Sequence, residues 1–324
     1  MIVSRRTMIG ASLAAGISAR TAGQTLRAGA SEPNETIELW PSGAPGKPST
    51  PLVETLTERS TDPQLNDRAL FGISRPRIVV FRPANPNGAA ILITPGGGYR
   101  WVVVDKEGYE LARWFAARGV TVFVLFYRLP GEGWLAGPNV ALSDAQRAMR
   151  LIRHRATDFS IDPNRVAAMG FSAGGHLCCD LNTRFAATTY APVDKADAHS
   201  ARPSLSAPIY PVVSMSAPLA HMGSRAKLLG LNPPPALEMA HSPHLHVSAT
   251  APPMFLVHAE DDAIVRPENS LLMRAALRSM DVPVETHLFA RGGHGFGLRK
   301  AIGKPAQVWP QLFLDWAQSM HWGG

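Results

Sequence analysis

The chain has 324 residues, of which 45% are hydrophobic and 18% charged, a balance typical of a globular enzyme and too apolar for a disordered chain. Four arginines and no acidic residue lie in the first 30 positions, so they supply +4 of the net charge of +7 and leave +3 on the remainder. No basic run with interleaved aromatic residues follows, which argues against a nucleic-acid partner. No apolar run approaches the roughly 20 residues of a membrane span. The two cysteines, Cys178 and Cys179, are adjacent, which suits small apolar helix residues better than a disulfide or a zinc site.

Residues 1–30 predict a cleaved export signal. The pair Arg5-Arg6 precedes a short apolar stretch of small residues at 10–19, which is the order of a secretory signal. The paired arginines resemble a twin-arginine signal, the bacterial address for export of folded proteins. The alternative is an ordinary amphipathic helix, which glycines at 10, 16 and 23 and the lack of a polar face disfavour. We therefore expect a periplasmic or secreted protein that uses the twin-arginine export machinery in transit.

From about residue 37 the chain alternates short apolar runs with helical patterns, as βα units do. Strands are predicted at 78–82, 89–94, 120–127, 165–169, 205–210, 254–258 and 284–289. Helices are predicted at 107–118, 143–156, 173–185, 268–280 and 306–319, the second of them opened by a capping box at Ser143. The segments 190–203 and 232–253 are rich in proline, histidine and alanine and predict long loops, which often form substrate walls in enzymes. The pattern predicts one α/β domain over residues 31–324, with a mostly parallel central sheet flanked by helices.

A Gly-Phe-Ser-Ala-Gly pentapeptide at 170–174 matches the pattern G-x-S-x-G. It lies between a predicted strand and a predicted helix, which is the setting of a nucleophile elbow, whereas the pentapeptide by itself could be a chance turn. The flanking glycines avoid side-chain clashes where the backbone doubles back. Ser172 is therefore the candidate nucleophile. His176 follows on a helix that runs away from the serine, so a packing role is the better interpretation.

The Thr-Pro-Gly-Gly-Gly-Tyr sequence at 94–99 follows a predicted strand directly, where the H-G-G-G loop of esterases occurs. Its glycines allow backbone amides to face a developing negative charge. The alternative is a dinucleotide-binding loop, but Trp101 occupies the place where that motif needs its third glycine. The expected oxyanion donors are the amides of Gly97 and Gly98, together with that of Ala173.

A base and an acid should follow the serine in the chain. His294 lies in a glycine-rich loop at 291–297, after the last predicted strand, and is the candidate general base. Another apolar strand ends in Glu-Asp-Asp at 260–262, where a buried acid can hold the imidazole tautomer and stabilise the imidazolium. Adjacent residues of an extended segment point to opposite sides, so Asp261 and Asp262 should not both face the histidine. The histidines at 241, 244 and 246 have no nearby carboxylate pair, so no metal site is expected.

Together these motifs resemble those of α/β-hydrolase esterases related to bacterial acetyl and acetylxylan esterases. The Glu-Leu-Trp-Pro-Ser-Gly-Ala-Pro-Gly sequence at 38–46 is also similar to the start of such enzymes. The resemblance implies the α/β-hydrolase fold and serine ester hydrolysis through an acyl-enzyme, without a cofactor, on an acetylated sugar or polysaccharide fragment. Two aromatic residues near the motifs, Tyr99 and Trp101, could stack on a sugar and give this substrate weak additional support. Pro95 replaces the histidine of the H-G-G-G form, which leaves open which glycine amides face the oxyanion.

The resemblance also selects between the two aspartates. Family members read His-Gly-x-x-Asp-x-x-Val at this strand end, which aligns with residues 258–265 and picks Asp262. The implied triad is Ser172, Asp262 and His294.

Two other functions stay open. A serine peptidase of the prolyl-oligopeptidase kind shares the fold and the triad, but the segment before the first predicted core strand is too short for the propeller of such enzymes. A non-catalytic binding protein of the same fold usually lacks a triad member, and all three candidates are present here.

Overall fold

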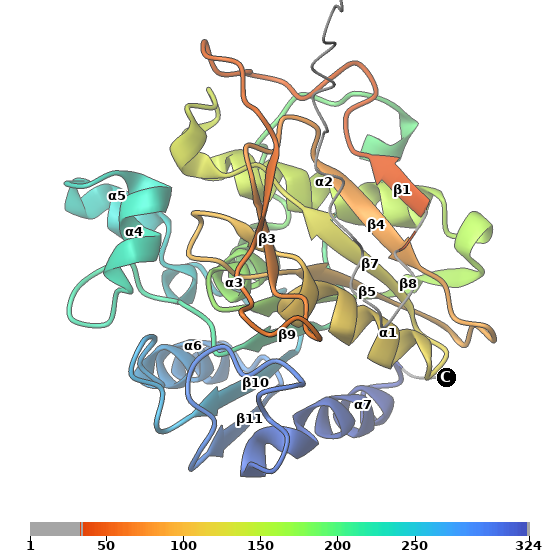
Figure 1. Ribbon diagram of the computed structural model, residues 1–324, viewed down its shortest axis with the longest axis vertical. Helices are drawn as coiled ribbons and strands as arrows, with labels where there is room; N and C mark the ends of the chain where they lie inside the picture. The colour runs from red at the N-terminus through yellow and green to blue at the C-terminus, as the bar shows by residue number, and fades with distance from the viewer. Residues whose placement is uncertain (1–32, 34, 323–324) are drawn as a thin grey trace, which may run out of the picture.

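An eight-stranded sheet forms the centre of the protein in the computed structural model, which describes residues 33 and 35–322 (Figure 1). Its strand order is β1-β4-β7-β5-β8-β9-β10-β11. The strands from β7 to β11 in this order pair in parallel. The strand β4 pairs antiparallel with both of its neighbours, β1 and β7. The bounds are β1 (Glu35–Glu38), β4 (Arg77–Phe81), β5 (Gly88–Thr94), β7 (Thr121–Phe126), β8 (Ile161–Phe171), β9 (Ser206–Ile209), β10 (Met254–Ala259) and β11 (Val284–Phe289). The predicted export signal at 1–30 lies outside the described residues.

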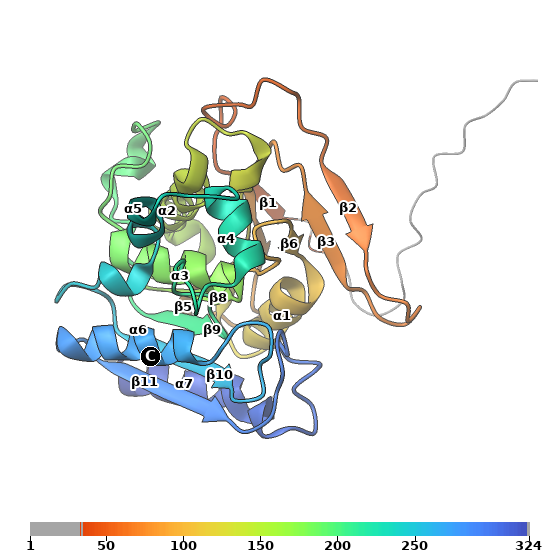
Figure 2. The ribbon, with the colours of Figure 1, turned by 90° about the vertical axis from the view of Figure 1, so that its left-hand side faces the viewer.

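A second, antiparallel sheet has the order β2-β3-β6 and lies to one side of the molecule in Figure 2. Its strands are β2 (Thr55–Glu58), β3 (Arg68–Phe71) and β6 (Val102–Val103). Because β6 follows the glycine-rich loop at 94–99 directly, this small sheet holds the far end of that loop.

Helices cover both faces of the main sheet. Their bounds are α1 (Glu110–Ala116), α2 (Val140–His154), α3 (Ala173–Arg184), α4 (Met222–Leu229), α5 (Pro235–Ala240), α6 (Glu268–Ser279) and α7 (Trp309–Ser319). Successive side chains of β10 point to opposite faces of the sheet and so show which helices lie on each face. Phe255 packs against Phe313 of α7, with ring centroids 5.7 Å apart, whereas its neighbours Met254 and Leu256 belong to the cluster that includes α6. Phe313 also meets Phe115, which places α1 in the layer of α7.

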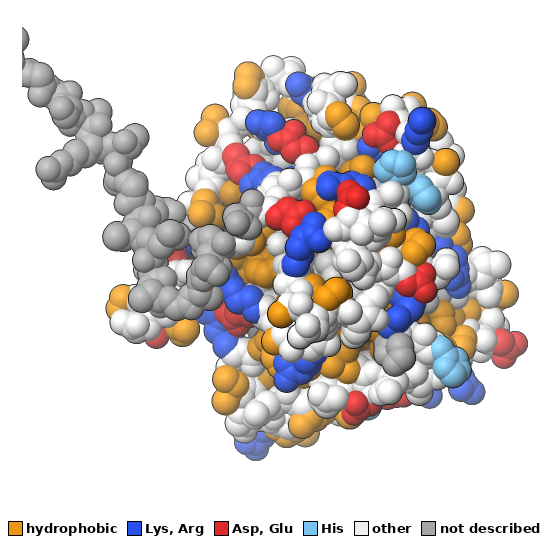
Figure 3. Space-filling view, turned by 90° about the vertical axis from the view of Figure 1, so that its right-hand side faces the viewer, with side chains coloured by type: hydrophobic (Ala, Val, Ile, Leu, Met, Phe, Trp, Pro, Cys, Tyr) orange, Lys and Arg blue, Asp and Glu red, His pale blue; other side chains and the backbone are white. Residues whose placement is uncertain are grey.

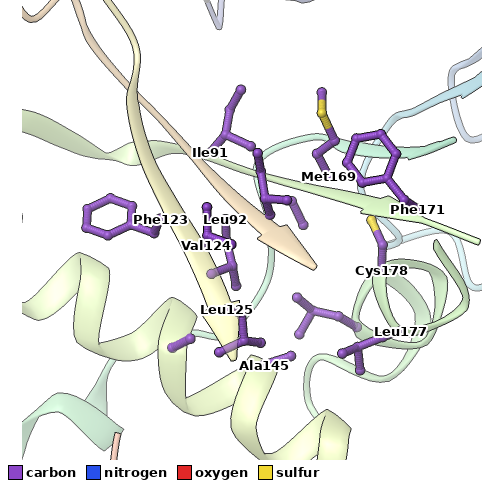
Figure 4. Packing of buried hydrophobic residues seen from close by; sticks show 14 of the residues in the cluster. Ile91, Leu92, Phe123, Val124, Leu125, Ala145, Met169, Phe171, Leu177 and Cys178 are labelled. Atoms are coloured by element: carbon purple, nitrogen blue, oxygen red, sulfur yellow. The ribbon is translucent and has the colours of Figure 1, made fainter. Parts of the chain in front are cut away.

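Buried aliphatic and aromatic side chains fill the space between the sheet and the helices. Figure 4 shows Leu92 and Val124 of the central strands together with Ala145 of α2 and Leu177 of α3. The strand β7 is buried along its whole length, as a parallel strand covered on both faces must be. The mostly parallel sheet flanked by helices that the sequence predicts is confirmed.

Three parts of the sequence prediction are wrong. The helix α2 starts at Val140 and not at Ser143, which lies inside the helix and does not cap it: the Ser143 hydroxyl donates to the Asn139 carbonyl, 3.0 Å away. The segment 232–253 is not all loop, since it contains α5 and a short 3-10 turn at Pro243–Leu245. The strands β1, β2, β3 and β6 were not predicted, because each has only two to four residues and so shows too short an alternation to be recognised.

The surface carries charges of both signs. On the face shown in Figure 3, basic and acidic side chains are interspersed, and among the coloured residues neither sign gathers into one continuous patch. Within residues 33 and 35–322, no helix has the length and apolar character needed to cross a membrane.

Candidate active site

The candidate nucleophile occupies a tight turn between β8, which ends at Phe171, and α3, which begins at Ala173. Ser172 has φ +54° and ψ −116°, a conformation that L-residues rarely adopt. The glycines on either side are needed for close approach. A Cβ on Gly170 would lie 2.2 Å from the Gly174 carbonyl oxygen, and one on Gly174 would lie 2.1 Å from that of Thr94. The strand–turn–helix setting predicted for the pentapeptide is therefore present.

The structure brings the three predicted triad residues together at the carboxyl ends of β8, β10 and β11. Ser172 Oγ lies 2.8 Å from His294 Nε2, and His294 Nδ1 lies 2.7 Å from Asp262 Oδ2. Because a carboxylate can only accept, Nδ1–H donates to Asp262, and Nε2 is then free to accept from the serine hydroxyl. This is the arrangement in which the imidazole can take the serine proton.

Asp262 is buried and has hydrogen-bond partners on both carboxylate oxygens. Its Oδ1 accepts from the amides of Ile264 and Val265, both at 2.9 Å, while its Oδ2 also lies 3.2 Å from His258 Nε2. Burial opposes ionisation of this carboxyl, but the hydrogen bonds from His258 and His294 outweigh it and hold the pKa of Asp262 well below its usual range. Asp262 is thus a charged, fixed partner for the imidazole.

The neighbouring acids have other partners. Asp261 Oδ1 accepts hydrogen bonds from the amides of Gly292, at 2.8 Å, and Gly293, at 2.7 Å, and these bonds lower the pKa of Asp261. Asp261 therefore fixes the backbone of the loop that carries His294, and its exposed neighbour Glu260 faces solvent. The opposite directions expected for Asp261 and Asp262 are those that the structure shows.

The glycine-rich loop after β5 lies against the serine. The Gly96 amide donates to Glu107 Oε2 over 3.0 Å, so it is not available to a substrate. Gly97 and Gly98 have φ angles of +131° and +65°. Within the described part of the chain, the amides of Gly97, Gly98 and Ala173 have no protein acceptor. These are the three predicted oxyanion donors. Because the Gly96 amide is bonded to Glu107, Gly97 and Gly98 are the glycines of this loop whose amides are free to face an oxyanion.

The two aromatic residues predicted to stack on a sugar are placed differently. Tyr99 is only 2% exposed, and its hydroxyl donates to His176 Nδ1 over 2.7 Å, so it supports the loop and exposes too little of its ring to stack on a sugar. His176 in turn donates from Nε2 to the His241 carbonyl, as expected of a packing histidine. Trp101 is half-buried, and the guanidinium carbons of Arg59 and Arg100 lie 5.5 and 4.8 Å from its ring centroid. The stacking role is therefore wrong for Tyr99, and at Trp101 a sugar would compete with two arginines.

A pocket of about 270 Å³ opens beside this loop. Its lining is Phe71, Tyr99, Arg100, Trp101, Leu129, Gly131, Glu132 and Lys227. The helix α4, which contributes Lys227, begins at Met222 after the cap residue His221 and lies with α5 at the left of the molecule in Figure 1. A Cβ on Gly98 would lie 3.9 Å from Ser224 Oγ, so the first turn of α4 faces the glycine-rich loop.

Two buried residues near the site were not identified from the sequence as functional. Glu107 was assigned only to a helix, yet it contacts Gly96, and Tyr210, at the end of β9, has its ring centroid 5.2 Å from that of His294. The signal for Glu107 is an acid in an apolar helical pattern, which is costly to bury without partners. Among the residues that the structure describes, no group of three His, Cys, Asp or Glu side chains is arranged to hold a metal ion.

Known proteins of similar sequence and structure were found. The BD-FAE family matches residues 80–277. The chain is 31% identical over 225 residues to an acetylxylan esterase of Xylanibacter ruminicola, covering 68% of this chain and 44% of that protein. It is 35% identical over 205 residues to endo-1,4-beta-xylanase B of Butyrivibrio fibrisolvens, covering 63% of this chain and 32% of that protein. The chain thus spans less than half the length of these two relatives.

A solved structure also matches. The acetyl ester-xyloside bifunctional hydrolase of Caldicellulosiruptor lactoaceticus superimposes with a TM-score of 0.73 at 34% identity, covering 90% of this chain and 97% of that one. The α/β-hydrolase fold implied by the sequence motifs is therefore confirmed. Because the family match covers more than half of the chain, the protein belongs to the BD-FAE family.

Proposed function

We propose that the protein is a serine carboxylesterase that hydrolyses short-chain esters, chiefly acetyl esters of sugars or polysaccharide fragments. The observation that carries the proposal is the hydrogen-bonded chain Ser172–His294–Asp262 beside the free amides of Gly97 and Gly98. The acetylxylan esterase and the acetyl ester-xyloside hydrolase among its relatives support the choice of substrate.

The geometry supports an acyl-enzyme mechanism. Ser172 Oγ attacks the ester carbonyl carbon while His294 Nε2 takes the serine proton, and the tetrahedral oxyanion accepts from the free amides of the glycine-rich loop and of Ala173. The C–O bond to the alcohol then breaks, and His294 gives its proton to the leaving oxygen. Water, deprotonated by the same nitrogen, attacks the acyl-serine, and the acid leaves as the serine regains its proton. Asp262 stabilises the imidazolium at each stage.

The pocket beside the glycine-rich loop supports a polar alcohol. Three of its lining side chains are charged, namely Arg100, Glu132 and Lys227, and its volume of about 270 Å³ is small.

We expect turnover of aryl esters to be highest for acetyl and to fall as the acyl chain lengthens to octanoyl. The acetylxylan esterase and the acetyl ester-xyloside hydrolase among its relatives support this preference for the acetyl group. The measurement is kcat/KM across aryl acetate, butyrate, hexanoate and octanoate, run beside acetylated xylan and a prolyl peptide. A steady rise from acetyl to octanoyl would contradict the acyl preference, and cleavage of the peptide in preference to every ester would favour a peptidase.

We also propose export of the folded protein by the twin-arginine route, on the basis of Arg5-Arg6 and the modest apolar stretch that follows. Changing both arginines to lysine keeps the charge of the signal but should trap the precursor in the cytoplasm of the native host. Fractionation and immunoblotting would measure this, with Arg20→Lys and Arg27→Lys as the control. Undiminished periplasmic accumulation of the double-lysine variant would exclude the route.

A further inference from the structure

We propose that Glu107 is a positioning residue that ties the glycine-rich loop to the His294 loop beneath the nucleophile, with Tyr210 as the connecting side chain. The inference rests on the proposed serine-esterase function, since it concerns how that site is held in its working geometry. Glu107 lies in a π-helical turn, Asp105–Tyr109, just before α1, and is only 3% exposed.

One oxygen of the carboxylate holds the glycine-rich loop. Glu107 Oε2 accepts from the Gly96 amide at 3.0 Å. Gly96 packs so closely here that a Cβ on it would lie 2.5 Å from this oxygen and 3.1 Å from Ser172 Cβ. The bond therefore acts where the loop touches the nucleophile, one residue before the free amide of Gly97. It also orients Gly96 so that its amide points away from the substrate.

The other oxygen reaches the loop of the base. The Tyr210 hydroxyl donates to Glu107 Oε1 over 3.0 Å and accepts from the Gly297 amide over 3.1 Å. Burial, followed by the nearby Glu107 carboxylate, raises the pKa of Tyr210 well above its usual range, so the phenol keeps the proton that it donates. The tyrosine ring also packs edge-on against the imidazole of His294, with centroids 5.2 Å apart.

A purely structural role explains these contacts poorly. Within the described chain Glu107 forms no ion pair, and a buried carboxyl without a cationic partner costs stability relative to an apolar side chain of the same size. One of its hydrogen bonds goes to the loop that carries the oxyanion donors, and the other goes to Tyr210, whose hydroxyl accepts from the loop that carries the general base. A displacement of about 1 Å between such groups lowers turnover strongly, because the donors must meet the oxyanion and the base must meet the serine.

The test compares Glu107→Gln with Tyr210→Phe, and uses Glu110→Gln as the matched control. Glutamine keeps the size, but one of its two terminal positions becomes an N–H donor that faces either the Gly96 amide or the tyrosine hydroxyl. Phenylalanine removes only the connecting hydroxyl. Glu110 lies three residues away on α1 and is paired with Arg299, which is neither a triad residue nor an oxyanion donor.

Steady-state kinetics with an aryl acetate would be combined with active-site titration by an organophosphonate, so that turnover is counted per reactive serine. Affinity for an aryl boronic acid, which forms a tetrahedral adduct on the serine, would be measured in parallel. We expect Glu107→Gln to lower kcat about 10- to 100-fold with KM changed less than about threefold, and to weaken boronate binding by a similar factor. Tyr210→Phe should act in the same direction by about 3- to 10-fold, and Glu110→Gln should leave kcat and KM within about twofold of the wild type.

Unchanged kcat per titrated serine and unchanged boronate affinity in Glu107→Gln would overturn the inference, as would a rise in KM at constant kcat. If Glu107→Gln does not fold, Tyr210→Phe decides the matter by the same two readouts. An inactive wild-type protein that no phosphonate labels would instead mean that the proposed esterase function is wrong.

Discussion

Replacing Ser172 with alanine should abolish ester hydrolysis while leaving the protein folded. The change removes the oxygen that attacks the ester carbonyl and that lies 2.8 Å from His294 Nε2. Loss of a triad member typically lowers turnover by about 10³-fold or more, and what remains comes from the oxyanion donors and from binding. Turnover of an aryl acetate by purified variant and wild type, matched by circular dichroism and melting temperature, gives the measurement.

An organophosphonate provides a second readout for the same variant. The wild-type enzyme should be labelled once per chain and the Ser172→Ala variant not at all, whereas a non-catalytic binding protein would show no labelling in either form. Ser279→Ala is a suitable control, because Ser279 is exposed at the end of α6 and its hydroxyl only contacts the Ala276 carbonyl. Retention of more than about a tenth of wild-type turnover by Ser172→Ala would remove Ser172 from the role of nucleophile.

Replacing Asp262 with asparagine should lower turnover by about 10³- to 10⁴-fold at neutral pH. Asparagine keeps the shape but removes the charge that stabilises the imidazolium, and its amide can place an N–H opposite His294 Nδ1. The depressed pKa of Asp262 means that this charge is present throughout the neutral range. The effect should fall on kcat with little change in KM, because the aspartate acts on the base and not on the substrate.

Asp261→Asn is the matched control for this prediction. Asp261 uses one carboxylate oxygen, Oδ1, to accept from the amides of Gly292 and Gly293, and the side-chain oxygen of asparagine can still accept both bonds. Its cost in turnover should therefore be less than about tenfold. Greater damage from Asp261→Asn than from Asp262→Asn would reverse the assignment of the two acids.

Much of this architecture could be predicted from the sequence because its strongest local patterns coincide with its functional parts. The strands β8, β10 and β11 are each followed by residues whose types are unusual after a strand: a serine between glycines, adjacent aspartates, and a histidine between glycines. Parallel strands gather such ends at one edge of the sheet, so local patterns become a shared site. The choice of Asp262 over Asp261 needed the family resemblance as well, because strand alternation says only that the two side chains point in opposite directions, not which of them faces His294.

The contacts that hold the site together could not be predicted in the same way. Glu107 and Tyr210 are 103 residues apart, and each lies in an element whose periodicity says only that it is buried. The helix start at Val140 was missed for a related reason. The residues taken for a capping box are used across the fold, with Asp144 paired to Arg128 and accepting from the Trp40 indole. Short-range patterns report local preference, and tertiary partners can override it.

The strained backbone of Ser172 lowers the stability of the fold at the residue that the activity requires. A serine at φ +54° and ψ −116° is held in a sparsely populated region, at a cost of roughly 1–3 kcal/mol that the surrounding hydrogen bonds and packing must offset. Alanine at this position would keep that cost, whereas glycine would release it. A Ser172→Gly substitution would therefore stabilise the fold and remove the nucleophile at the same time. Screens for thermostable variants of this protein should select for activity and stability together.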